Sequence, residues 1–135
     1  MDAIESMANE SYPADLLYHP EHDWARVEGE EATLGITWYA QDQLGEVVFV
    51  EPPAVGTKLT QGEVYAEVES VKAVADVLAP LSGEIVASND ALRENPLAIN
   101  EDPYGEGWLV KIRLTDPAER DGLMDADAYA ASLAG

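Results

Sequence analysis

The sequence predicts a mainly β fold with short peripheral helices. Two segments of alternating apolar and polar residues, 64–70 and 74–78, lie on either side of Lys72. A repeat of two residues is typical of half-buried strands, and these segments lack the spacing of a helix. Clusters of Gly, Pro, Asn and Asp separate further short apolar runs, as turns separate strands. The chain of 135 residues is long enough for one domain with a single core.

The N-terminal part predicts a tail and then two strands. Residues 1–14 are polar and acidic without periodicity, so we expect a flexible tail followed by a single domain over residues 15–135. Residues 24–27 predict a strand that turns at Gly29 into a second strand, 32–36.

A short helix is predicted over residues 38–44. Thr37 is a suitable N-cap, and Gly45 is a suitable left-handed residue to end the helix. The strand that follows ends at Pro52-Pro53, after which the chain turns toward the strands around Lys72.

The second half of the chain predicts further strands and peripheral helices. Residues 82–88 and 109–114 have the composition of strands, and a helical turn precedes Pro96. Asp116 is followed by a proline and an acid at helix-start positions. A second start at Asp125 begins a C-terminal helix that we expect to dock on the sheet.

Lys72 is at or near the tip of a predicted tight hairpin. The junction from Ser70 to Ala73 joins the two alternating segments, and the chain has few other lysines (Lys58 and Lys111) among 27 acidic residues. Rigid strands would hold this amine in solvent, where a modifying enzyme can reach it. The alternative is a solvated turn lysine without a function.

Composition excludes several classes of function. A formal net charge of −20 opposes nucleic acid binding, which needs a basic patch. No apolar run is long enough to span a bilayer, and there is no cysteine for disulfides, thiolate metal sites or catalysis. The acidity favours basic protein surfaces as partners, or it reflects a salt-adapted organism. The acidic N-terminus lacks a targeting pattern, so we expect a cytoplasmic protein of bacterial type.

The chain offers no recognisable catalytic constellation. It has neither a Gly-rich phosphate loop nor a nucleophile with a base, so we expect a non-catalytic protein. His19 and His22 lie near Asp23, but no third ligand has a suitable spacing, and we expect no metal site. A Schiff-base lysine needs an apolar pocket, which a hairpin tip among glutamates does not provide. An exposed Lys72 is better suited to carrying an acyl group whose chemistry belongs to a cofactor.

Several longer motifs are spread over the chain: HDW, GIT-YAQ, LGEVVFVEPPAVG, EVESVKAVADVLAPLSGEIVASNDAL and INEDPYGEGWLVKI. Together they resemble the H proteins of the glycine cleavage system, a family of lipoyl carriers, and the likeness extends from about residue 18 to residue 133. The resemblance implies a barrel-sandwich hybrid of the lipoyl-domain type, with two antiparallel sheets, short peripheral helices and a C-terminal helix.

The resemblance also implies that Lys72 carries lipoate in amide linkage. The swinging arm would take the aminomethyl group from glycine decarboxylase (P protein) to aminomethyltransferase (T protein), and the dithiol to dihydrolipoamide dehydrogenase (L protein). Lipoyl-attaching enzymes would be further partners. The chain would then be a non-catalytic carrier subunit in glycine catabolism.

Residues near the lysine resemble positions through which lipoyl domains present it for lipoylation. These are Glu69, Gly56 and Gly83. Glu69 could equally be a solvated strand acid, and turn geometry alone could require both glycines.

The resemblance further implies a docking place for the arm. The family has a glutamate in the motif HEW where this chain has Asp23, and commonly Asp-His where this chain has Trp38-Tyr39. A nearby carboxylate favours the ammonium form of the loaded arm, which resists loss of the thiolate. We expect Asp23, Trp38 and Tyr39 to receive the arm. The alternative for Trp38 and Tyr39 is that they are exposed helix residues covering the sheet.

Two other functions agree with the residues. An H-like scaffold that relays lipoate to other lipoyl proteins would carry the same motifs, and only a glycine–bicarbonate exchange assay separates the two roles. A biotin carrier is the other possibility, although Val71 and Ala73 stand where biotin carriers usually have methionines.

Overall fold

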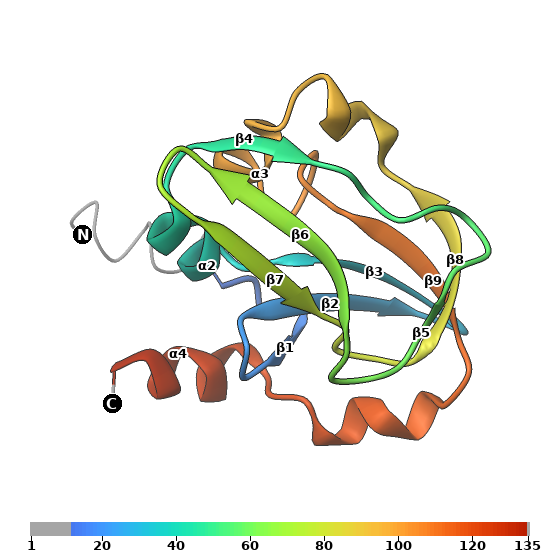
Figure 1. Ribbon diagram of the computed structural model, residues 1–135. Helices are drawn as coiled ribbons and strands as arrows, with labels where there is room; N and C mark the ends of the chain where they lie inside the picture. The colour runs from blue at the N-terminus through green and yellow to red at the C-terminus, as the bar shows by residue number, and fades with distance from the viewer. Residues whose placement is uncertain (1–11, 135) are drawn as a thin grey trace.

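The computed structural model describes residues 12–134, so the predicted tail over residues 1–14 lies almost entirely outside the described residues. The described chain forms two antiparallel sheets that face each other (Figure 1). The larger has the strand order β1 (Leu17–His19), β2 (Asp23–Glu28), β3 (Glu31–Ile36), β9 (Val110–Leu114), β8 (Gly83–Ser88), β5 (Lys58–Leu59). The smaller has the order β4 (Val47–Val50), β6 (Val64–Ser70), β7 (Val74–Leu78). The predicted mainly β fold with two antiparallel sheets is confirmed.

Short helices lie at the periphery of the sheets, as predicted. They are α2 (Trp38–Leu44), η1 (Asp90–Arg93), α3 (Ala98–Glu101), η2 (Pro117–Gly122) and α4 (Ala126–Ala134). The side chain of Thr37 accepts the N–H of Ala40 and so caps α2, and the carboxylate of Asp125 caps α4 by accepting the N–H of Ala128. Both helix starts therefore agree with the sequence.

The end of α2 differs from the prediction in one respect. The N–H of Gly45 donates to the carbonyl of Gln41, and Gly45 has φ +84° and ψ −160°. This is not the left-handed helical conformation but a more extended one that is essentially restricted to glycine. The carbonyl of Gly45 accepts a hydrogen bond from Nδ2 of Asn100. Oδ1 of the same asparagine accepts the N–H of Val47. The requirement for glycine was predicted, but the conformation is set by contacts with α3.

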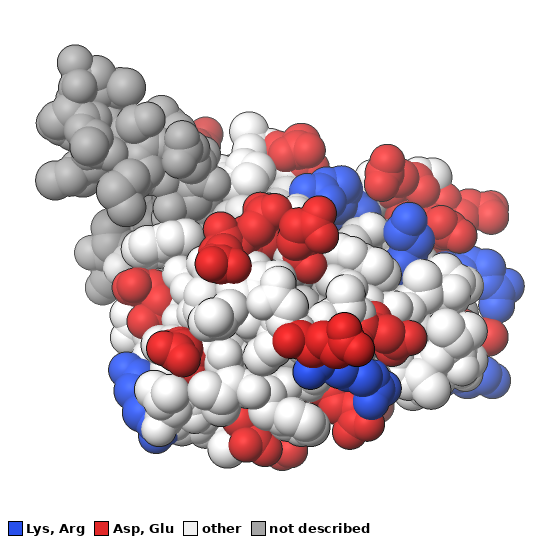
Figure 2. Space-filling view, turned by 90° about the horizontal axis from the view of Figure 1, so that it is seen from above, with Lys and Arg blue, Asp and Glu red and all other residues white. Residues whose placement is uncertain are grey.

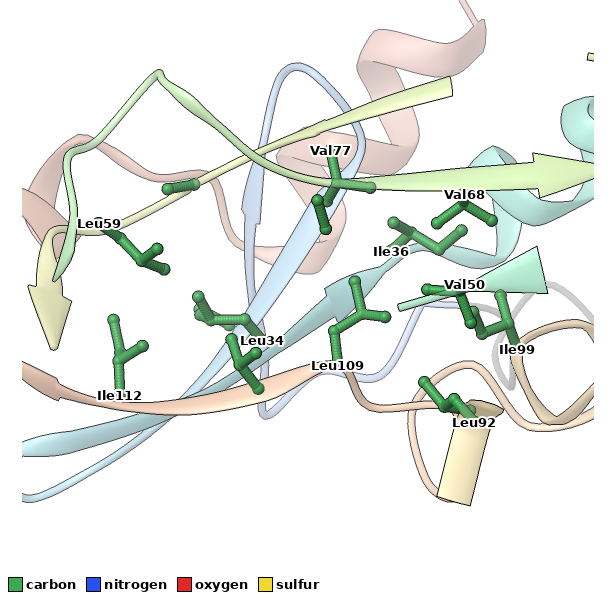
Figure 3. Close-up of a cluster of buried hydrophobic side chains, with 14 of the residues drawn as sticks. Leu34, Ile36, Val50, Leu59, Val68, Val77, Leu92, Ile99, Leu109 and Ile112 are labelled. Atoms are coloured by element: carbon green, nitrogen blue, oxygen red, sulfur yellow. The ribbon is translucent and has the colours of Figure 1, made fainter. Parts of the chain in front are cut away.

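The main core fills the space between the two sheets. Alternation along the strands directs one apolar face of each sheet inward, and Figure 3 shows these side chains meeting. The buried residues include Leu34, Ile36, Leu109 and Ile112 near the larger sheet and Val50, Val68 and Val77 from the smaller sheet. Burying each such side chain stabilises the fold by about 1.5–3 kcal/mol.

A second cluster covers the opposite face of the larger sheet, where α4 docks. Tyr18 and Trp24 are paired across β1 and β2, and Tyr129 of α4 stacks on Tyr18 with 4.8 Å between ring centroids. Gly35 lies opposite Trp24, and a Cβ at that position would be 2.7 Å from the indole ring. Glycine is therefore required where the indole crosses β3, and the predicted docking of the C-terminal helix on the sheet is confirmed.

Candidate functional site

The predicted hairpin with Lys72 at its tip is present between β6 and β7. Glu69 and Val74 form the last cross-strand pair before the turn. The N–H of Ser70 donates to the carbonyl of Ala73 at 2.8 Å, and Oγ of Ser70 accepts the N–H groups of Lys72 (3.3 Å) and Ala73 (3.1 Å). The serine side chain therefore ties together the backbone of the turn that presents the lysine.

The tip is also attached to the end of α2, while the lysine itself remains exposed. The N–H of Val71 donates to the carbonyl of Glu46 at 3.0 Å. The Cε of Lys72 lies 3.5 Å from the position that a Cβ on Gly45 would occupy, so the lysine stem passes over this glycine. Within the described part of the chain no ion pair holds Lys72. The amine is thus both accessible and supported by a fixed backbone.

The other residues that resemble lipoylation positions lie at different places. Glu69 is exposed on the outer side of β6, next to the turn. Gly56 and Gly83 are at the β5–β8 edge, at the opposite end of the molecule from the hairpin tip (Figure 1). Gly56 has φ +95°, and a Cβ on Gly83 would be 2.5 Å from the carbonyl oxygen of Arg113. Turn geometry and strand packing therefore account for both glycines, and their role in recognition stays a prediction.

Asp23 lies in the interior between the sheets. It is paired with Ile36 of β3, so the two side chains project from the same face of the larger sheet. Figure 3 shows Ile36 directed toward the smaller sheet, with Val68 above it. Asp23 is 1% exposed, and its Oδ2 has no hydrogen-bond partner among the described residues. Burial, and secondarily the charge of Glu21, raises the pKa of Asp23 well above its ordinary value.

Trp38 and Tyr39 form the first turn of α2 and are half-buried. The N–H of Trp38 donates to the hydroxyl of Tyr104 at 2.8 Å. The ring of Tyr39 lies 4.6 Å from that of His22, centroid to centroid. Because His22 is the residue before Asp23, Tyr39 lies close to the start of β2, at the end of α2 opposite Gly45.

Two tyrosines near Asp23 were not identified from the sequence as site residues. The hydroxyl of Tyr129 is 2.7 Å from Nδ1 of His22 and 2.8 Å from Oγ1 of Thr37. The hydroxyl of Tyr65 is buried without a partner among the described residues. Burial raises the pKa of both tyrosines, and the charge of Asp23 contributes in both cases. The sequence held one signal for Asp23 itself, since it directly precedes the predicted strand 24–27 and alternation puts it on the same face as Ala25 and Val27.

The surface is strongly acidic, in keeping with the net charge of −20. Figure 2 shows acidic side chains spread across one face, with fewer basic side chains between them. The helices within residues 12–134 are all too short or too polar to cross a membrane.

Known proteins resemble this chain over most of its length. A family profile described as Glycine cleavage H-protein matches residues 16–134. The glycine cleavage system H protein of Symbiobacterium thermophilum is 57% identical over 123 residues, which cover 91% of this chain and 94% of the relative. The probable glycine cleavage system H protein of Haloarcula marismortui is 53% identical, covering 87% of this chain and 92% of the relative.

A solved structure agrees with the fold. The crystal structure of a glycine cleavage system H protein from Mycobacterium marinum superposes with a TM-score of 0.81 and 37% identity, covering 91% of this chain and 99% of that chain. The barrel-sandwich, lipoyl-domain-like fold implied by the resemblance is thereby confirmed. Because the family profile and the relatives cover most of the sequence, the chain belongs to the glycine cleavage H-protein family, the lipoyl carriers of the glycine cleavage system.

Proposed function

We propose that this chain carries lipoate in amide linkage on Nζ of Lys72 and serves as the shuttle of the glycine cleavage system. The observation that carries the proposal is an exposed lysine at the tip of a hairpin whose turn is fixed by backbone and serine hydrogen bonds. None of these bonds uses the lysine amine, so acylation can remove its charge without disturbing the turn.

The residues present fit such a group. Lipoate, when bound, supplies the dithiol that carries the aminomethyl group. The chain supplies the lysine to which lipoate is attached and the residues against which its far end docks. Helix α2 has seven residues and is about 10 Å long. Lys72 lies over Gly45, at the C-terminal end of α2. Asp23 is paired with Ile36, which lies just before the N-terminal end of α2. A lysine side chain extended by lipoate is longer than this helix, so the arm can lie along α2 and reach Asp23.

We propose that Asp23, Trp38 and Tyr39 form the docking place for the far end of the arm. The partnerless Oδ2 of Asp23 is available to accept a hydrogen bond from an amino group. A carboxylate there stabilises the ammonium form, whose nitrogen has no free lone pair to expel the thiolate. Trp38 and Tyr39 would close over the arm from the first turn of α2. Since Asp23 is buried in this structure, the arm can reach it only if the side chains that cover it move apart.

The partners we propose are glycine decarboxylase, aminomethyltransferase and dihydrolipoamide dehydrogenase, together with an enzyme that attaches lipoate. The chain itself would be non-catalytic. Glu69, exposed beside the turn, is our candidate for a contact with the attaching enzyme, and Gly56 and Gly83 would act by shaping the fold. Relatives from bacteria and from Haloarcula support the proposal that the chain lies in a cytoplasm of the bacterial type.

The attachment is tested by intact mass. Incubation with lipoate, ATP and a lipoyl-attaching enzyme should add the mass of one lipoyl group to the wild type and none to Lys72→Arg. Lys58→Arg, which changes another exposed lysine, is the matched control and should be lipoylated normally. Lipoylation of Lys72→Arg would contradict the proposal, and the mass of biotin in place of lipoate would favour a biotin carrier.

Two further measurements test the role of the carrier. Lipoylated protein should support glycine–bicarbonate exchange with glycine decarboxylase, and failure to do so would favour the lipoate-relay scaffold. Hydrolysis of the aminomethyl-loaded arm should be faster in Asp23→Ala than in the wild type. Equal rates in the two proteins would remove Asp23 from the docking place.

A further inference from the structure

Two buried polar atoms of the described residues lack a hydrogen-bond partner: Oδ2 of Asp23 and the hydroxyl oxygen of Tyr65. Folded proteins pair nearly all of their buried polar groups, so each exception asks for an explanation. One oxygen belongs to the larger sheet and the other to the smaller sheet. Both are oxygens with free lone pairs, so a single donor group between the sheets could satisfy both.

Both side chains pack into the main core between the two sheets. The pairing of β6 with β7 shifts register between Val64 and Ala66, and such a bulge re-aims the side chain of the residue between them, Tyr65. The Tyr65 ring packs against the main core, which contains Ile36, the cross-strand partner of Asp23.

The electrostatics agree with this placement. After burial, the charge of Asp23 is the second cause that raises the pKa of Tyr65, so the two groups are within electrostatic range of each other. No basic side chain contributes to the raised pKa of Asp23, whose causes are burial and the charge of Glu21. Among the described residues, a carboxyl group and a hydroxyl group are therefore the two polar groups at this place that lack a partner.

We propose that Tyr65 and Asp23 together bind the primary ammonium group at the end of the arm, an inference that rests on the proposed docking at Asp23. The carboxylate of Asp23 accepts one N–H of the ammonium, and the phenolic oxygen of Tyr65 accepts a second. One cation thus satisfies both partnerless oxygens. The arm without an amine offers no such cation, so the site distinguishes the amine-bearing arm from the empty one.

The experiment compares Tyr65→Phe with the wild type in the lipoylated protein. Hydrolysis of the loaded arm breaks the S–CH₂ and C–N bonds, water supplies the oxygen of formaldehyde, the sulfur leaves as a thiol, and the amine leaves as ammonium. Loss of a hydrogen bond to a charged group should make Tyr65→Phe release formaldehyde about tenfold faster than the wild type. Tyr18→Phe is the matched control: it removes a hydroxyl that donates to the carbonyl of Pro13, on the other face of the sheet, and should leave the rate unchanged.

A second readout does not depend on the rate of hydrolysis. The carboxyl ¹³C resonance of Asp23 should shift when the amine is loaded, and the shift should be altered in Tyr65→Phe. Tyr65→Phe should also be at least as stable as the wild type to denaturant, because it removes a buried hydroxyl that has no partner within residues 12–134.

The outcomes separate this inference from the proposed function. Fast hydrolysis in Asp23→Ala with a wild-type rate in Tyr65→Phe would overturn the role of Tyr65 and leave docking at Asp23 intact. A wild-type rate in Asp23→Ala would overturn both. A Tyr65→Phe variant that hydrolyses fast but leaves the Asp23 resonance shift unchanged would also overturn the shared site.

Discussion

The lysine hairpin and the neighbourhood of Asp23 are built in opposite ways. The hairpin is a continuous segment, residues 64–78, whose turn is held mainly by its own hydrogen bonds and whose apical side chains are exposed, with Val71 67% and Val74 60% accessible. Asp23 is 1% exposed and is surrounded by side chains from segments far apart in the chain. Two of them are Tyr65 and Tyr129, whose pKa values the charge of Asp23 raises.

The difference follows from what we propose that each region does. A lysine that several enzymes must reach needs exposure together with a stiff backbone, and a local hairpin provides both. A group that shelters an amine from water needs burial, which only segments that converge in the folded protein provide. We therefore expect substitutions at the hairpin tip to change attachment and those around Asp23 to change stability.

The largest effect on stability is expected for Tyr129→Ala. Tyr129 is fully buried, stacks on Tyr18 and connects His22 to Thr37 through its hydroxyl. Its removal leaves a cavity under the larger sheet and should lower the free energy of unfolding by about 3–5 kcal/mol, measured by urea denaturation. Lipoylation of Lys72 should continue at temperatures where the variant is folded.

The matched substitution in the other region is Val71→Ala. Its side chain is mostly exposed at the tip, so the free energy of unfolding should stay within about 0.5 kcal/mol of the wild type. Similar losses in Tyr129→Ala and Val71→Ala would contradict the contrast between the two regions.

Gly45→Ala tests the point at which the regions meet, and we expect a loss of roughly 1–3 kcal/mol in unfolding free energy. The cause is the backbone, with φ +84° and ψ −160°, since the added methyl group would be at an ordinary 3.5 Å from Cε of Lys72. Gly122→Ala, a position with open space around it, is the control and should be close to the wild type. Equal stability of the two variants would show that Gly45 is not strained.

Ser70→Ala should have a smaller effect, a loss of about 1 kcal/mol. Oγ of Ser70 accepts the N–H groups of Lys72 and Ala73, and without it the turn keeps only the backbone hydrogen bonds from Ser70 to Ala73 and from Val71 to Glu46. The rate of lipoylation should fall together with stability, because the lysine is then presented by a looser turn. An unchanged rate, measured by intact mass over time, would mean that the attaching enzyme does not require this geometry.

The hairpin was predictable because its determinants are contiguous. The alternation of residues 64–70 and 74–78 gave the strands, and their junction gave the turn with Lys72. The caps Thr37 and Asp125 were predictable for the same reason, since a cap and its helix are neighbours in the sequence.

The neighbourhood of Asp23 was only partly predictable. The resemblance identified Asp23, but neither the bulge that re-aims Tyr65 nor the contact of Tyr129 with His22 and Thr37 has a local signature. The prediction for Gly45 was wrong in its conformation because a helix-stop signal does not include Asn100, which binds the carbonyl of Gly45 from α3.

The smallest effect on the free energy of unfolding is expected for Asp23→Asn at acid pH. The difference from the wild type should grow as the pH rises. Burial holds the pKa of Asp23 well above the value of 3.8 for an ordinary carboxyl group. Between these two values the folded state keeps a proton that the unfolded chain releases, so this group makes the wild type less stable as the pH rises through that window.

The asparagine variant lacks this proton, so its unfolding free energy relative to the wild type should increase from about pH 4 upward. Urea denaturation at a series of pH values measures the difference. Glu21→Gln should weaken the trend without abolishing it, because the charge of Glu21 is the second cause of the raised pKa after burial. Parallel stability curves for Asp23→Asn and the wild type would mean that the carboxyl group is solvated in the folded protein, and the enclosed docking place proposed for the arm would then be lost.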